Sequence, residues 1–106
     1  MQKNIIIMAN FEINLDKLEM AAGKLRAISH PLRIAILELL AQGRPLSVTE
    51  IYKTLKIEQA TASHHLNILK NKNVLVSKRD GKKIFYSLRS NTLMEIIECI
   101  NRCNEE

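Results

Sequence analysis

The chain has 106 residues, and its 16 Lys and Arg side chains against 11 Asp and Glu give a formal net charge of +5. That length fits one domain, and a hydrophobic share of 46% with a charged share of 25% excludes an intrinsically disordered protein. The longest strongly apolar run, residues 5–9, falls far short of the roughly 20 residues that span a bilayer, so no membrane partner is expected. Two cysteines do not make a disulfide scaffold, so a reducing cytoplasm is expected.

Residues 1–14 are expected to form an N-terminal tail, and Met8 is an alternative start of translation. The first helical pattern follows this tail. Apolar residues then recur at i, i+3, i+7 and i+10, the spacing of one face of an α-helix. They are Leu15, Leu18, Ala22 and Leu25. The spacing predicts an amphipathic helix from Asp16 to Ile28.

A second helix is expected to begin after His30 and Pro31, because proline suits the first turn of a helix, where its missing N–H costs nothing. Residues 32–41 are apolar nearly all round, so this helix belongs at the centre of the domain. Gly43 followed by Pro45 is a typical stop signal.

Two short helices joined by a brief turn are expected next. Ser47 and Glu50 have the spacing of a capping box and begin the first of them. The second begins at Glu58 or Gln59 and ends at about Asn71. Two such helices in succession are typical of a helix-turn-helix motif.

The apolar pattern then changes from a helical period to a period of two. Residues 74–79 and 83–88 flank Asp80 and Gly81, and both positions of an Asp-Gly turn favour a positive φ. A β-hairpin is therefore predicted.

A last helix is expected to follow, with Ser90 or Asn91 as its N-cap and an apolar stripe of Leu93, Ile96, Ile97 and Ile100. The complete order is a mainly α (α+β) winged helix-turn-helix fold, with about five helices and a two-stranded β wing. Residues 15–106 form this single domain.

Most of the basic excess lies in one segment. Residues 70–89 hold seven basic residues against Asp80 alone, so their net charge is +6 and the rest of the chain sums to −1. A solvated surface is one explanation of such a run, and a patch that binds a polyanion is the other.

The second helix of the pair has an outer face that is polar and mostly uncharged. With roughly 100° per residue, the apolar stripe of Ala62, Leu66 and Leu69 points inward, so the polar residues of the helix point outward. Side chains of these polar types can reach the edges of DNA bases. We predict base contacts by Gln59, Ala60, Thr61, Ser63, His64 and Asn67. We predict phosphate contacts by the cations at the helix end and in the hairpin, which are Lys70, Lys78, Arg79, Lys82 and Lys83.

Three motifs follow in order: AISHPLRIAIL at residues 27–37, QATASHHL at residues 59–66, and a third over residues 74–88 that includes Arg79 and Gly81. Together they resemble the ArsR family of winged-helix transcriptional repressors, and the resemblance covers roughly residues 16–103.

The resemblance implies a homodimer built from the first and last helices and an inverted-repeat operator. One recognition helix would lie in each major groove, with the wing near the flanking minor groove. The family's pattern places recognition positions at Gln59, Ala60, Ser63 and His64. Asn73 stands where the family often has glycine, and asparagine tolerates a left-handed backbone there.

We therefore predict a dimeric, sequence-specific DNA-binding regulator, a repressor that an inducer releases from double-stranded DNA. The alternative is a winged-helix protein-interaction module whose basic wing is incidental. No Gly-rich phosphate loop, nucleophile motif or pair of carboxylates can be placed, so no enzymatic activity is expected.

The three histidines do not have the spacing of a metal site. His64 and His65 are adjacent and point roughly 100° apart on a helix, so both cannot face one metal ion. We interpret His30 as a cap or packing residue and His64 as a DNA contact, and assign no metal ligand.

The resemblance also implies an inducer, and two metal sites known in the family are absent. Residues 46–51 contain no cysteine, and the last helix contains no histidine. Cys99 and Cys103 remain as candidate sensor thiols. Three interpretations of the pair are open. The two cysteines could be small apolar residues of a dimer interface, ligands of a thiophilic metal or metalloid ion that acts as inducer, or thiols of a redox switch. No cofactor is otherwise required.

Overall fold

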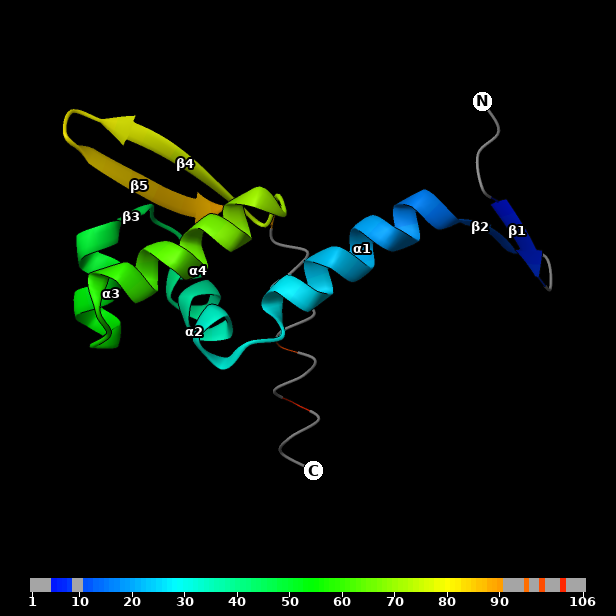
Figure 1. Cartoon of the computed structure of the whole chain (residues 1–106), viewed down its shortest axis with the longest axis horizontal. Coiled ribbons are helices and arrows are strands. Elements are labelled where there is room, and N and C mark those ends of the chain that lie inside the picture. Colours follow the sequence, from blue (N-terminus) through cyan, green and yellow to red (C-terminus); the bar gives the residue numbers. More distant parts are fainter. Residues whose placement is uncertain (1–4, 9–10, 91–94, 96–97, 99–101, 103–106) are drawn as a thin grey trace.

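The structure of the chain, a computed structural model, describes residues 5–8, 11–90, 95, 98 and 102. Its elements in chain order are β1 (Ile5–Met8), β2 (Phe11–Asn14), α1 (Leu15–Ile28), α2 (Pro31–Leu40), β3 (Leu46–Ser47), α3 (Val48–Leu55), α4 (Gln59–Asn71), β4 (Leu75–Asp80) and β5 (Lys83–Leu88). Figure 1 shows α2 to β5 gathered together, with α1 leading away from them to the N-terminal strands.

Helix α2 supplies the centre of the hydrophobic core. Ile36 and Leu37 are fully buried, and His30 caps the helix because its Nδ1 atom accepts a hydrogen bond from the Leu32 N–H at 3.2 Å. The other elements from α1 to β5 pack around this centre through Ala27, Ile28, Leu46, Ile51, Leu66, Leu69, Val74, Leu75 and Tyr86. The central second helix and the capping role of His30 are both confirmed.

The buried residues of helix α1 all lie in its C-terminal half. It begins at Leu15, one residue before the predicted start, with the Asn14 side chain accepting from the N–H groups of Asp16 and Lys17. Its apolar stripe is largely open, however, because Leu18 is 48% exposed and Leu25 is 45% exposed. The described part of the chain therefore does not cover the stripe.

The wing hairpin belongs to a sheet of three antiparallel strands rather than two. Strand β3 pairs with β5, which pairs in turn with β4, so the strand order is β3-β5-β4. The two residues of β3 are too few to show any alternation, which is why the sequence pattern did not reveal this strand.

The hairpin turn lies one residue later than predicted. Asp80 is the last residue of β4 and pairs with Lys83, so Gly81 and Lys82 form the two-residue loop. Among these residues only Gly81 has a positive φ, of 64°. A positive φ at the first loop position alone is the pattern of a type II′ turn, which glycine favours there.

The segment predicted to be an N-terminal tail contains a β-ribbon. Strands β1 and β2 pair antiparallel, with Met8 opposite Phe11 and Ile5 opposite Asn14. The alternating sequence of residues 11–14 suits such a strand. Figure 1 places this ribbon at the far end of α1 from the helix-turn-helix.

The structure describes four helices, and the predicted last helix falls largely outside the described residues. Residues 95, 98 and 102 are helical, whereas Cys99 and Cys103 are not among the described residues.

Candidate nucleic-acid interface

Local hydrogen bonds fix the start of the helix-turn-helix. The predicted capping box is present, because Ser47 Oγ accepts from the Glu50 N–H and Glu50 Oε1 accepts from the Ser47 N–H, each at 3.2 Å. Arg44 Nη2 also donates to Glu50 Oε2 at 2.9 Å. The backbone N–H of Ser47, followed by Arg44, holds the pKa of the Glu50 carboxyl below its usual value.

The turn between the two helices has a left-handed residue at its start. Lys56 caps the C-terminus of α3 with φ 56° and ψ 46°, and its N–H donates to carbonyls of the last turn of that helix. Helix α4 then begins at Gln59, three residues later. This turn directs α4 across α2 and α3 and leaves one of its sides facing outward (Figure 1).

The outward side of α4 is the face predicted from helical periodicity. Ala62, Leu66 and Leu69 are fully buried, and His65 is also buried. Thr61 and Ser63 are half-buried at the border between the two sides. The exposed residues of the helix are Gln59, Ala60, His64, Asn67, Lys70 and Asn71. An exposed strip of small and polar uncharged side chains, with Lys70 at its C-terminal end, therefore runs along α4.

The cations of the wing are exposed. They are Lys78, Arg79, Lys82 and Lys83. Among the described residues, no carboxylate lies within ion-pair distance of any of them. Four exposed cations within residues 78–83 that form no salt bridge with the other described residues favour contact with a polyanion.

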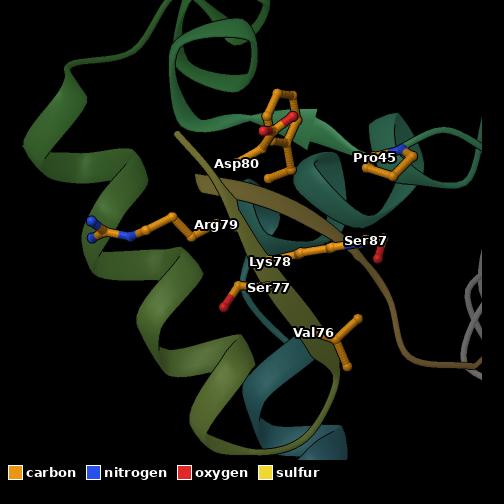
Figure 2. A pocket seen from close by; sticks show the side chains of 8 residues that line it. Pro45, Val76, Ser77, Lys78, Arg79, Asp80 and Ser87 are labelled. Carbon is orange, nitrogen blue, oxygen red and sulfur yellow. The ribbon is translucent and has the colours of Figure 1, made fainter. Parts of the chain in front are cut away.

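The two neighbouring cations of β4 lie on opposite faces of the hairpin. Figure 2 shows Arg79 and Ser77 pointing to the side of β4 that faces α4, whereas Lys78 and Val76 point to the other side. This follows from the alternation of side chains along a strand. Arg79 therefore adjoins the α4 strip, and Lys78 belongs to the outer face of the wing.

A shallow hollow lies on that outer face. It is lined by residues that include Pro45, Val76, Lys78, Phe85 and Ser87 (Figure 2). Val76 is 36% exposed, which leaves an apolar spot beside the basic residues of the hairpin.

The buried histidine of α4 has a role that the sequence did not reveal. His65 Nδ1 accepts a hydrogen bond from Arg33 Nε at 3.1 Å. The rings of His30 and His64 lie 4.6 Å and 5.3 Å from the His65 ring, measured between centroids. Position 65 lies three residues after Ala62 and one before Leu66, so a helical wheel already places it near the buried stripe.

Burial is the main reason why the pKa of His65 lies below its usual value. The nearby His30, Arg33 and His64 lower it further, because each disfavours an added positive charge. The imidazole is therefore neutral at pH 7, and its Nδ1 atom is an acceptor there.

Comparison with known proteins identifies this arrangement. A family model described as a helix-turn-helix domain matches residues 28–76. The uncharacterized HTH-type transcriptional regulator MJ1325 of Methanocaldococcus jannaschii is 37% identical, over 82% of this chain and 98% of that protein. The transcriptional repressor PagR of Bacillus anthracis is 34% identical, over 90% of this chain and 95% of that protein.

Two solved structures show the same fold. The crystal structure of PagR matches with a TM-score of 0.74, over 82% of this chain and 99% of that chain. The homodimeric winged helix-turn-helix DNA-binding domain of a possible ArsR-family regulator from Mycobacterium bovis matches with a TM-score of 0.76 and 25% identity, over 87% of this chain and 84% of that chain. The chain belongs to the ArsR family.

The ArsR-family fold brings the predicted recognition and wing residues to adjoining surfaces. Of the predicted positions, Lys78 turns to the outer face of the wing. Lys83 belongs to the same face by register, because it pairs with Asp80, two residues after Lys78. Among the described residues, no helix is long and apolar enough to cross a membrane, and no group of three potential metal ligands is found. The candidate thiols of this ArsR-family chain lie outside the described residues.

Proposed function

We propose that the protein is a dimeric, sequence-specific DNA-binding repressor. In the proposed complex, α4 of each protomer lies in the major groove of one half of an inverted repeat. The wing holds the neighbouring phosphates, with Arg79, Lys82 and Lys83 nearest to them. Such a repressor works in the cytoplasm, as the cysteine content suggests.

The observation that supports this proposal best is the separation of charge on the exposed surface. The strip of Ala60, His64 and Asn67 on α4 is uncharged, and the cations begin at Lys70 and continue through the wing. Asparagine and histidine side chains suit base edges, whereas lysine and arginine suit phosphates. A generic basic surface would not separate the two kinds of residue in this way.

The exposed apolar side of α1 supports the dimer. Leu18 and Leu25, seven residues apart on one side of the helix, remain about half exposed. Exposed apolar residues at helical spacing are typical of a protein–protein contact. The M. bovis relative is named as homodimeric, and we propose the same state for this chain, with α1 and the last helix in the interface.

A DNA titration tests the function. An inverted repeat is selected from a random duplex library with the protein, and its affinity is compared with that of a shuffled duplex at several salt concentrations. We expect clear preference for the selected repeat and a steep fall of affinity with salt. Absence of binding to any duplex at low salt would contradict the proposal and favour a winged-helix module that binds another protein.

For the signal that releases the repressor, we propose a thiophilic metal or metalloid ion or an oxidant that acts on Cys99 and Cys103. Their i, i+4 spacing supports this, because it places two soft ligands near one side of a helix. The double substitution Cys99→Ser and Cys103→Ser is expected to abolish release by such ions or oxidants in a reporter strain. An unchanged response would leave the two cysteines as apolar residues of the interface.

A further inference from the structure

One arginine joins the helix of the proposed dimer interface to the helix of the proposed DNA contact. Arg33 lies in the first turn of α2 and is half-buried. Its Nε donates to His65 Nδ1 of α4 at 3.1 Å, and its Nη1 donates to the Ala27 carbonyl of α1 at 3.1 Å. A single planar guanidinium therefore contacts both helices at once.

A cation at the position of Arg33 lowers the stability of the fold unless these two hydrogen bonds are made. The N-terminus of a helix carries a partial positive charge, so a cation in the first turn is disfavoured. The Ala27 carbonyl also needs a donor, because the residue four positions later is Pro31, which has no N–H. Arg33 supplies that donor, and the carbonyl end of α1 offers the partial negative charge that a cation prefers.

The contact with α4 depends on one protonation state of His65. The ring is 6% exposed, and Nδ1 accepts from Arg33, so the ring proton lies on Nε2. A protonated imidazole carries hydrogen on both nitrogens and cannot accept this bond. The titratable or charged groups that act on His65 are Arg33 and His30 at the start of α2 and His64 of α4 itself. From α1 the guanidinium meets a neutral carbonyl, and no charged group of α3 or β4 acts on the imidazole within the described residues.

We propose that Arg33 is a positioning residue that fixes the angle between α1 and α4 by bridging Ala27 and His65. In a dimer built on α1, that angle sets the separation of the two recognition helices. Arg33 would thereby determine which half-site spacing the repressor accepts, although it touches no DNA. This inference rests on the proposed function.

The first test uses half-site spacing. The probes are the selected inverted repeat, two derivatives with one base pair added or removed between the half-sites, and a shuffled duplex. Lysine keeps the charge but lacks the fork that reaches two acceptors, so Arg33→Lys should bind the matched repeat about tenfold more weakly. It should also discriminate less between the matched and altered spacings, while binding the shuffled duplex as the wild type does.

Arg44→Lys is the matched control. Arg44 is an exposed arginine that pairs with Glu50, and within the described part of the chain its side chain makes no hydrogen bond to α1 or α4. This variant should therefore keep the wild-type preference for spacing. If Arg33→Lys kept that preference as well, the positioning role would be wrong.

The second test uses pH and does not depend on Arg33→Lys folding. In His65→Asn, the amide oxygen accepts from Arg33 at every pH. The wild type is expected to lose affinity for the matched repeat on going from pH 7.5 to pH 5.5 by a several-fold larger factor than His65→Asn. His30 and His64 are present in both proteins, so the difference reports on His65. Equal pH profiles of the two proteins would overturn the proposal.

The two proposals fail in different ways. A wild-type protein that does not prefer the selected repeat would overturn the DNA-binding function and the positioning role together. A wild type that prefers the repeat, with an Arg33→Lys variant that matches it in spacing preference or a His65→Asn variant that matches it in pH response, would overturn the positioning role alone. Circular-dichroism melting at pH 7.5 identifies the variants that are folded for comparison.

Discussion

Leu46 of β3 lies opposite Tyr86 of β5, and both side chains are buried. The next residue, Ser47, pairs with Phe85 and also caps α3. The third strand of the sheet is therefore continuous with the first helix of the helix-turn-helix. This connection links the base of the wing to the helix-turn-helix, so the wing and the α4 strip form one structural unit.

Loss of the Leu46 side chain should loosen that unit. Leu46→Ala removes a buried side chain at the junction of β3 and β5, and such changes cost about 2–5 kcal/mol of unfolding free energy. Urea unfolding followed by circular dichroism measures the loss. Val76→Ala is the control, because this half-open residue on the outer wing face should change stability by less than about 1 kcal/mol. Equal losses would contradict the structural role given to β3.

Substitution of His64 should change sequence preference rather than overall affinity. The side chain is exposed at the middle of the α4 strip, and one good base contact contributes about 1–3 kcal/mol of discrimination. His64→Ala is therefore expected to bind the selected repeat more weakly and the shuffled duplex as the wild type does. Ser63→Ala should act in the same sense at a neighbouring base pair. A uniform loss on all duplexes would show that His64 contacts the backbone instead.

Substitution of Lys82 should do the opposite. Lys82 is exposed in the loop of the wing, where it is expected to neutralise a phosphate. Lys82→Ala should weaken binding to every duplex and reduce the slope of log affinity against log salt by about 1. Lys83→Ala should give a similar change. Fluorescence anisotropy at a series of salt concentrations measures the slope, and an altered base preference would argue against a phosphate contact.

The left-handed residue of the helix-turn-helix offers a stabilising change. Lys56 has φ 56°, a conformation that costs a residue with a Cβ atom about 1–2 kcal/mol relative to glycine. Lys56→Gly should therefore raise the free energy of unfolding by about 1 kcal/mol in urea. Asn73 has φ 60°, and Asn73→Gly should gain less because asparagine tolerates this region. The reverse change, Gly81→Ala at φ 64°, should destabilise the wing turn.

Tyr86 should make stability depend on alkaline pH. Burial raises the pKa of its phenol above the usual value of 10.0. The unfolded chain therefore loses this proton at lower pH than the folded protein does. The contribution is complete below pH 10 and disappears as pH rises through the raised pKa. Melting temperatures between pH 8 and pH 11 should fall more steeply in the wild type than in Tyr86→Phe, and parallel curves would contradict this assignment.

The local elements of this fold follow from short-range sequence signals. The spacing of Ser47 and Glu50 predicted the start of α3, and the period of Ala62, Leu66 and Leu69 predicted the buried side of α4. These signals suffice because caps and helical faces depend on residues within a few positions of one another.

The parts that the sequence did not predict depend on distant residues. Strand β3 forms because Leu46 pairs with Tyr86 of β5, which is distant in the sequence. The role of His65 likewise depends on a hydrogen bond from Arg33, which is 32 positions away. The stripe that contains Leu18 and Leu25 was recognised as apolar, but periodicity does not say what covers such a face.

The division between an uncharged α4 strip and a charged wing also has a kinetic consequence for the proposed repressor. Long-range attraction comes from the wing and the end of α4, so these cations should govern how fast the protein associates with DNA and slides along it. The α4 strip adds little to that attraction and acts only once the bases are within reach, so it should govern how long the protein stays. The rate of search and the time of residence would thus be set by different side chains, and each could change in evolution without the other.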